Sequence, residues 1–376
     1  MAETVLTRLE AAAVRLRVGR VGGYDRALVY AFALLALLGV VLSFAAGPVA
    51  AARIGIEAPF HFTERHVVFL GIAVIASSAA ATLSRVQVRR AGVILALVSL
   101  GLMLLAMLIG PEIKGARRWL AFGGISLQPS EFLKPGFVMA AAWFLSASAR
   151  DDGFPGSMAS LVLYGVASVF LLLQPDYGQW LLLTGIWMVM FFVAGWSWAW
   201  IAGLGGSASA ALGLGYLTQS HVRARIDRFL DPASGDTYQT DKAVEAISSG
   251  GIFGHDLHEV SGVKASLPDA HTDFIFAVAV EEFGLVLGLL IIGLFGVIAL
   301  RGFAAALGAT DPFRRCAIAG LTAAITLQAA INIGVNVSLL PAKGMTLPLI
   351  SYGGSSLMAT GLTAGLLLAL TRRTRT

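Results

Sequence analysis

The stretch Leu267–Phe276, LPDAHTDFIF, joins a long polar segment of the chain to a long apolar run. Pro268 is tolerated in the first turn of a helix, and acidic residues are favoured there by the exposed N–H groups and by the helix dipole. The sequence therefore predicts that a helix opens over 268–273 at a membrane surface. At that place Asp273 is either a helix-capping residue or an ionised carboxylate that can act as a base.

The composition of the chain is that of a membrane protein. Of its 376 residues, 57% are hydrophobic and 13% are charged, whereas an ordinary soluble domain carries about 25% charged residues. The length fits about ten helices of roughly 20 residues, so we expect an all-α polytopic membrane protein with ten transmembrane helices. The single cysteine, Cys316, excludes a disulfide framework and a cysteine metal site. The net charge of +5 is not a signal for nucleic-acid binding.

The apolar runs predict one transmembrane domain over 27–370, flanked by tails at 1–26 and 371–376. A large outer loop over 219–270 separates the seventh and eighth helices. We expect the ten spans at about 27–46, 66–84, 91–110, 131–149, 157–174, 179–195, 198–217, 274–300, 315–339 and 354–370.

Short basic clusters, such as Arg85, Arg89 and Arg90, flank the inner ends of these spans. Cytoplasmic loops of membrane proteins carry an excess of Lys and Arg. Both termini are therefore expected in the cytoplasm, which leaves the large loop on the outer face.

Two outer segments have features of their own. Tyr238–Ser249 has weak helical periodicity and ends at a Gly-Gly pair, so it predicts a short helix that lies on the membrane surface. The last outer loop, 340–356, is rich in Gly, Pro, Ser and Thr. Such backbone near membrane depth is tolerated only where it is buried in protein or lines a cavity. Close helix packing by small residues is the alternative explanation for its SYGGSS part.

The outer segments are unusually basic. Arg117 and Arg118 lie beside Trp119, a pattern typical of the headgroup level, and Arg223 opens a run of three arginines within six residues. The arginine fork matches the geometry of phosphate groups. This pattern indicates a phosphate-bearing lipid or a phosphorylated polar substrate.

Glu131 and Lys134 are three residues apart at the start of an apolar span, so both face the same side of a helix. A charged pair at membrane depth is costly and usually faces a cavity or the interior of the helix bundle. The pair is therefore either a structural ion pair between helices or part of a cavity that meets an anionic group. Ser130 and Lys134 are four residues apart, which is not the spacing of the SxxK motif of penicillin-binding enzymes.

Five ordered motifs together carry a family resemblance: GARRWLAFGGISLQPSEFLK (115–134), QPDYGQ (174–179), DTYQTDKAVEAISSGGIFG (236–254), LPDAHTDFIFAVAVEEFG (267–284) and LPAKGMTLPLISYGGSS (340–356). They resemble the SEDS family, which includes FtsW, RodA and SpoVE, and the resemblance spans about residues 25–370. It implies a ten-helix fold and a peptidoglycan glycosyltransferase that polymerises lipid II on the outer face of the bacterial cytoplasmic membrane. Lys343, followed by Gly-Met-Thr-Leu-Pro, is most similar to the division branch, FtsW.

The resemblance also implies site residues and partners. The catalytic aspartate of the family corresponds to Asp273, and its Glu–Lys pair in the cavity corresponds to Glu131 and Lys134. The expected partners are lipid II, a class B penicillin-binding protein (an FtsI-type transpeptidase) and other membrane proteins of the division septum, with no nucleic acid. The stretch 255–262 departs from the Gly-rich pattern of the family, which affects how this loop meets substrate or partner.

Glycan polymerisation joins the 4-hydroxyl of one sugar to the anomeric carbon of another and expels a lipid pyrophosphate. The hydroxyl needs a base, and the leaving group needs nearby cations. Our hypothesis is that Asp273 is the general base and that undecaprenyl pyrophosphate leaves with inversion. No cofactor is certain; a divalent cation, Mg or Mn, stays open. The expected substrate-binding residues are Arg117, Arg118, Trp119, Gln128, Ser130, Glu131, Lys134, Arg223, Lys343 and Ser355.

Three alternatives stay open. A transporter that flips lipid II fits the ten helices and the intramembrane charges equally well. A purely structural member of a division complex would leave the outer basic residues largely replaceable. An elongation-type polymerase, as in RodA, shares the same chemistry.

Overall fold

The computed structural model of the chain describes its residues in thirteen stretches. These are 20–21, 23–113, 115–123, 125–148, 155–196, 198–219, 223–224, 226–227, 229, 231, 238–254, 263–341 and 344–372.

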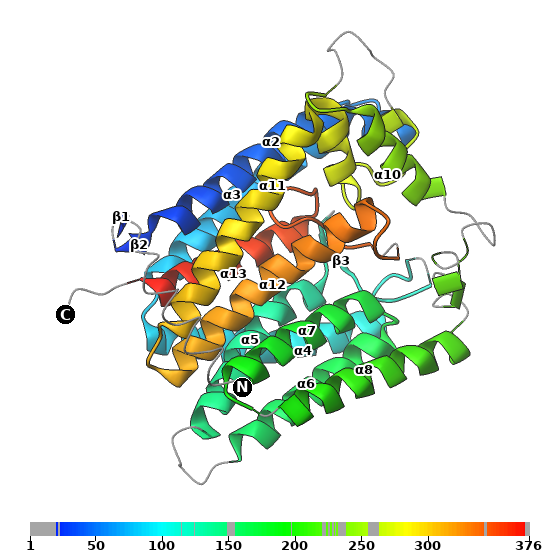
Figure 1. The fold of residues 1–376 in the computed structure, drawn as a ribbon. Coiled ribbons are helices and arrows are strands. Elements are labelled where there is room, and N and C mark those ends of the chain that lie inside the picture. Colours follow the sequence, from blue (N-terminus) through cyan, green and yellow to red (C-terminus); the bar gives the residue numbers. More distant parts are fainter. Residues whose placement is uncertain are drawn as a thin grey trace.

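Ten long helices run through the described part of the chain, and each coincides with one predicted span (Figure 1). Seven of them are long and apolar enough to cross a membrane, and α7 is a shorter apolar helix. The prediction of an all-α, multi-pass membrane protein with ten helices is therefore confirmed. The helices are α2 (Arg26–Arg53), α3 (His61–Thr82), α4 (Arg85–Ile109), α5 (Pro129–Ser148), α6 (Gly156–Leu173), α7 (Tyr177–Val193), α8 (Trp198–Thr218), α11 (Ile275–Leu307), α12 (Pro312–Asn336) and α13 (Gly354–Thr371).

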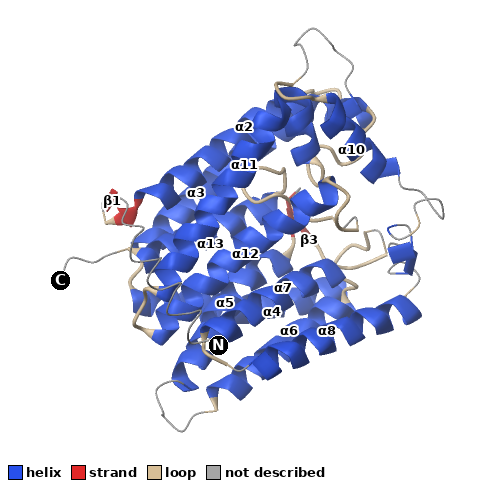
Figure 2. Cartoon of the chain, viewed as in Figure 1, coloured by secondary structure: helices blue, strands red, loops and turns tan. Residues whose placement is uncertain are grey.

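The remaining elements are short (Figure 2). The helix α10 (Tyr238–Ser249) has the bounds that the sequence predicts, and η2 (Val263–Ala265) is a single 3-10 turn. Two antiparallel pairs of strands are described, β1 (Arg20–Val21) with β2 (Tyr24–Asp25) and β3 (Leu120–Phe122) with β4 (Ile125–Leu127).

Polar residues cap the first turns of several helices. Asp25 caps α2 by accepting hydrogen bonds from the backbone N–H groups of Ala27 and Leu28, and its carboxylate also pairs with Arg301 of α11. Ser84 and Gln87 form a capping box at the start of α4. Asp25 lies just before the first predicted span and Ser84 is the last residue of the second, so these caps mark where α2 and α4 begin.

The helices α12 and α13 are mostly buried, whereas α3, α4, α6 and α11 are largely exposed. Glycines let α13 approach α3 closely: a Cβ atom at Gly361 would lie 2.5 Å from the carbonyl oxygen of Ala73, and one at Gly365 would lie 2.3 Å from that of Ser77. The exposed apolar faces suit contact with lipid, and α12 supplies the centre of the bundle.

The beginning of α11 differs from the sequence expectation. We expected a helix to open over 268–273, but these residues form turns and α11 begins at Ile275. Asp269 adopts a positive φ of 52°, which a helix does not allow. Farther along, α11 is kinked at Gly284, where φ is 77°.

Candidate functional site

Asp273 lies two residues before α11, on the turn that precedes the helix. The N-cap position belongs to Phe274, which makes no side-chain cap hydrogen bond, so Asp273 is not the capping residue. Its side chain is half-buried. A Cβ atom placed on Gly344 would lie 3.2 Å from Oδ2 of Asp273, so this carboxylate faces the backbone of the last outer loop.

Two asparagines of α12 hold the main chain of Asp273. The carbonyl oxygen of Asp273 accepts hydrogen bonds from Nδ2 of Asn332 at 2.8 Å and from Nδ2 of Asn336 at 3.0 Å. Oδ1 of Asn336 accepts the backbone N–H of Ala277 at 3.1 Å, so this side chain also caps α11 from a neighbouring helix. Both asparagines are buried, which makes these bonds costly to lose.

The last outer loop holds the two residues before Asp273. The backbone N–H of Tyr352 donates to the carbonyl of His271 at 2.9 Å, and Oγ of Ser351 donates to the carbonyl of Thr272 at 2.5 Å. Three successive carbonyls, those of residues 271 to 273, are thus hydrogen-bonded to donors from distant parts of the chain. A backbone restrained in this way holds the Asp273 carboxylate in a defined place, as a catalytic group needs.

His271 packs within a small aromatic group beside Asp273. Its ring centroid lies 4.3 Å from that of Phe62 and 5.5 Å from that of Tyr352. Burial lowers the pKa of His271 to about 4, although the nearby Asp269 carboxylate acts in the opposite direction. The imidazole is therefore neutral at neutral pH and adds no positive charge to the site.

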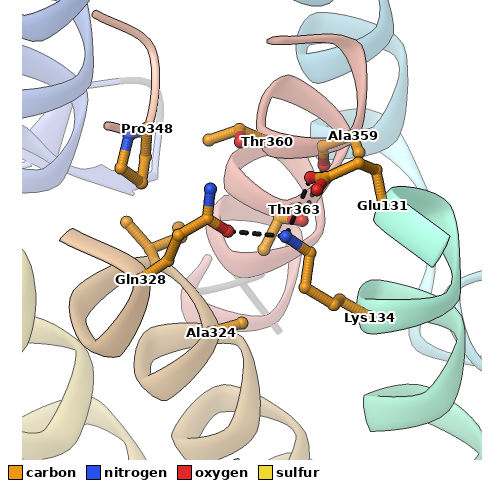
Figure 3. A pocket seen from close by; sticks show the side chains of 9 residues that line it. Glu131, Lys134, Ala324, Gln328, Pro348, Ala359, Thr360 and Thr363 are labelled. Atoms are coloured by element: carbon orange, nitrogen blue, oxygen red, sulfur yellow. Dashed lines mark hydrogen bonds and ion pairs between the residues drawn. The ribbon is translucent and has the colours of Figure 1, made fainter. Parts of the chain in front are cut away.

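Glu131 and Lys134 form a separate, buried site inside the bundle (Figure 3). Nζ of Lys134 lies 2.8 Å from Oε2 of Glu131 and donates to Oε1 of Gln328 at 2.6 Å. Oε1 of Glu131 accepts from Nε2 of Gln179 at 2.5 Å. With exposures of 4% and 6%, Glu131 and Lys134 are stable inside the protein because each charge meets a partner of opposite charge and an amide.

Hydrogen bonds extend this network toward the loops at one end of the bundle. Nε2 of Gln328 donates to the carbonyl of Thr346 at 2.9 Å, so the last outer loop reaches this site as well. On the other side, Asp176 accepts the backbone N–H of Gln179 at 3.3 Å and lies 4.0 Å from Arg118. Burial raises the pKa of Asp176, and the Arg118 guanidinium partly offsets that effect.

The cavity between α5, α12 and α13 is narrow. It is lined by Glu131, Lys134, Gln328 and small or apolar side chains, and it has room for about one water molecule. In this conformation the geometry is that of an internal ion pair. A role for Glu131 and Lys134 in binding substrate stays a prediction.

The predicted basic residues of the outer face have different surroundings. Nε and a terminal nitrogen of Arg118 donate to the carbonyls of Gln174 and Pro175, each at 2.7 Å, so this side chain fixes the turn before α7. Arg117 is 50% exposed and lies 3.8 Å from Glu112. Arg223 is exposed and donates to the carbonyls of Tyr216 and Leu217 in the last turn of α8. Lys343 lies outside the described residues.

The other predicted site residues lie near the buried network. The backbone N–H of Gln128 donates to Oγ of Ser355 at 2.9 Å, and Ser355 donates to the carbonyl of Ser126. Ser130 is buried in the first turn of α5, and Trp119 is partly buried just before β3. The departure at 255–262 lies outside the described residues. In the stretches that the structure describes, no three His, Cys, Asp or Glu side chains lie close enough together to hold a metal ion.

The sequence patterns did not point to the amide side chains that organise both sites. Gln328, Asn332 and Asn336 are spaced by four residues and so lie along one face of α12. An available signal was the recurrence of amides every four residues within an apolar span. Asp176 and Gln179 were also missed, although their motif, QPDYGQ, was recognised.

Comparisons with known proteins agree on one family. A family model described as cell cycle protein, for FtsW, RodA and SpoVE, matches residues 25–376. The chain is 45% identical over 349 residues to a protein of Caulobacter vibrioides (strain NA1000 / CB15N) named Probable peptidoglycan glycosyltransferase FtsW, covering 93% of this chain and 89% of that one. It is 36% identical over 372 residues to a protein of the same name from Alkalilimnicola ehrlichii, covering 94% and 92%.

Two solved structures have a similar fold. The first is a chain of the structure named "Structural coordination of polymerization and crosslinking by a peptidoglycan synthase complex". It matches with a TM-score of 0.75 and 30% sequence identity, and the match covers 93% of this chain and 97% of that chain. The other is the Thermus thermophilus rod shape determining protein RodA, with a TM-score of 0.67, 30% identity, and coverage of 93% and 96%.

Proposed function

Because the chain belongs to the FtsW, RodA and SpoVE family of cell cycle proteins, we propose that it is a peptidoglycan glycosyltransferase of the FtsW type, which polymerises lipid II into glycan strands during septal wall synthesis. The relatives named for this activity match the chain over nearly its whole length. The lysine-containing KGMTLP stretch supports the division branch over the elongation branch.

One observation carries the chemical part of the proposal: a half-buried carboxylate, Asp273, projects from a backbone whose carbonyls are held from several directions. In the proposed step the Asp273 carboxylate takes the proton of the acceptor 4-hydroxyl. The acceptor oxygen then forms a bond to the anomeric carbon of the donor, and the bond from that carbon to the pyrophosphate oxygen breaks. Direct displacement inverts the configuration, and undecaprenyl pyrophosphate leaves.

The leaving pyrophosphate needs positive charge close by. Arg117 is the exposed candidate, and Lys343, which directly precedes Gly344 in the sequence, is the second. Arg223 is exposed, but its guanidinium already donates to the carbonyls of Tyr216 and Leu217. Arg118 is already bonded to two carbonyls, so its proposed part is to shape the outer face and the turn before α7. Lys134 would contribute only after the narrow cavity opens.

The proposed partner is a class B penicillin-binding protein, an FtsI-type transpeptidase, acting with other membrane proteins of the division site. The support is the similarity to a chain from a peptidoglycan synthase complex whose name joins polymerization to crosslinking. The proposed location is the cytoplasmic membrane at the septum, with both termini in the cytoplasm. The Arg clusters at the predicted inner ends of the spans support that orientation.

The experiment that tests this function uses purified full-length protein in liposomes with fluorescent lipid II and the cognate class B transpeptidase. Two products are measured in parallel: glycan ladders on a gel, and lipid II that has crossed the bilayer. Glycan ladders that depend on this protein support the glycosyltransferase. Transfer of lipid II across the bilayer without ladders, under all partner conditions, would instead identify a flippase.

A further inference from the structure

The turn Gly250–Gly254, which follows α10, packs directly against the kink of α11. A Cβ atom on Gly250 would lie 2.1 Å from the carbonyl oxygen of Val280, and one on Gly254 would lie 2.2 Å from that of Glu282. A Cβ atom on Gly284 would in turn lie 2.2 Å from the carbonyl of Ile252. Only glycine allows the two backbones to come this close.

Hydrogen bonds join the turn to the kink. The backbone N–H of Leu285 donates to the carbonyl of Gly251 at 3.0 Å, and that of Val286 donates to the carbonyl of Ile252 at 3.3 Å. The positive φ of Gly284 interrupts the helical pattern at this point. The turn therefore satisfies N–H groups that the kink leaves without their usual helical partners, as backbone at membrane depth requires.

The charges of α11 place the kink relative to the bilayer. Glu281 and Glu282 precede the kink. The Glu281 carboxylate accepts the backbone N–H of Lys264, and the Glu282 carboxylate pairs with the side-chain amine of Lys264. From Phe283 onward α11 has no charged residue until Arg301. That interval is roughly 18 residues, or about 27 Å at 1.5 Å per residue, close to the thickness of a hydrocarbon core. The kink thus lies at the outer boundary of the hydrocarbon.

The tip of the turn is apolar and exposed. Ile252 is 63% exposed and Phe253 is 84% exposed, so two adjacent large apolar side chains form an exposed patch. The adjoining surface of α11 is formed by Leu285, Val286 and Leu289, which are also exposed and lie within the uncharged interval. The tip therefore continues a surface that is built to face lipid.

We propose that Ile252 and Phe253 insert into the outer leaflet and anchor the middle of the large outer loop to the membrane. The occupant of this surface is the acyl-chain region just below the lipid headgroups. The anchor holds α10 next to the outer part of α11, where Figure 1 shows the two helices side by side. Aromatic and aliphatic side chains at such a boundary are typical of interfacial anchors.

The test uses full-length protein in nanodiscs, with its only cysteine, the buried Cys316, replaced by serine. Single cysteines are introduced by Phe253→Cys and, as a second reporter of the tip, Ile252→Cys, and are labelled with an environment-sensitive fluorophore. Leu289→Cys on the exposed face of α11 is the lipid-facing control. Glu245→Cys, on the exposed side of α10, is the water-facing control. Quenching is measured with spin-labelled lipids and with aqueous iodide.

The proposal predicts a blue-shifted emission at 252 and 253, with a loss of fluorescence on spin-labelled lipid similar to that at position 289. Position 245 should respond to iodide and not to the lipid quencher. Quenching of 252 and 253 by iodide alone would overturn the proposal. So would protection from both quenchers, because that result would identify a covering protein, either a second copy or a partner helix.

Discussion

The two polar regions share one helix, α12, and differ in which groups that helix holds. Asn332 and Asn336 bind the main chain of Asp273, and its side chain stays half-buried at the surface of the loop. Gln328 instead binds the side chain of Lys134, whose charge is already matched by Glu131. The first arrangement positions a carboxylate, and the second holds charges inside the bundle. The difference fits the proposed role of Asp273 as a base and a structural role for the buried pair.

The two regions are joined by the last outer loop. Asn332 donates to the carbonyl of Met345 at 2.6 Å, and Gln328 donates to that of the next residue, Thr346. Two adjacent residues of this loop therefore connect the regions by hydrogen bonds. Variants that separate folding from turnover are needed to distinguish the two roles.

The largest effect is expected when the buried pair is broken. Lys134→Met leaves the Glu131 carboxylate buried without its cation, which costs about 3–5 kcal/mol in comparable cases. The thermal unfolding temperature of the detergent-solubilised protein should fall sharply. The matched double variant, Glu131→Leu with Lys134→Met, should recover much of that loss. An unchanged unfolding temperature for the single variant would show that the pair does not support the fold.

Acidification should destabilise the Asp273 region through His271. The folded-state pKa of His271 is lowered from 6.5 to about 4, so the unfolded chain binds the proton more readily between these values. The contribution of neutral His271 to the free energy of unfolding is complete above about pH 6.5 and is lost as the pH falls to about 4. At pH 5 this loss is about 2 kcal/mol. The measurement is the unfolding temperature between pH 7 and pH 4.5. His271→Phe should show a shallower decline, and equal slopes would contradict this role.

A smaller, separable effect is expected from the amides of α12. Asn336→Ala removes a donor to the Asp273 carbonyl and an acceptor for the backbone N–H of Ala277. We expect the polymerisation rate per folded molecule to fall about tenfold, which corresponds to about 1.4 kcal/mol of activation free energy. Gln328→Ala is the matched control on the same helix and should lower the unfolding temperature through Lys134. If Asn336→Ala turned over lipid II like the wild type, the hydrogen bonds of Asn336 would be irrelevant to catalysis.

The smallest effect is expected at the exposed arginine. Arg117→Ala should raise KM for lipid II a few-fold with little change in kcat, because an exposed cation contributes about 1 kcal/mol or less. The neighbour Arg118 is the comparison, since its side chain fixes two carbonyls. Arg118→Ala should lower the unfolding temperature. A drop in kcat for Arg117→Ala would place that residue closer to the reacting atoms than we propose.

Much of the fold could be predicted because apolar runs and basic clusters are local features of the sequence. The ten spans and α10 follow from periodicity and charge. The start of α11 at Ile275 could not be predicted. Pro268 and Asp269 suggested an earlier start from local sequence, whereas Asn336 of α12 caps the helix by accepting the backbone N–H of Ala277. The kink at Gly284 depends in the same way on a turn about thirty residues earlier in the chain.

Asp273 could be singled out as a candidate because it follows a polar segment and opens an apolar one. The hydrogen bonds to the carbonyls of residues 271–273 could not be predicted, because their donors come from α12 and from the last outer loop. Sequence reasoning likewise paired Glu131 with Lys134 by their spacing but did not identify Gln179 and Gln328, which come from other helices.

The most direct measurement compares wild type with Asp273→Asn in lipid II polymerisation, in the presence of the class B transpeptidase. Asparagine keeps the shape of the side chain and removes the base. The account predicts glycan ladders from the wild type and a loss of at least about a hundredfold in rate for the variant, at an unchanged unfolding temperature. Ladders of normal length and rate from folded Asp273→Asn would contradict the account, because another group would then take the proton of the acceptor hydroxyl.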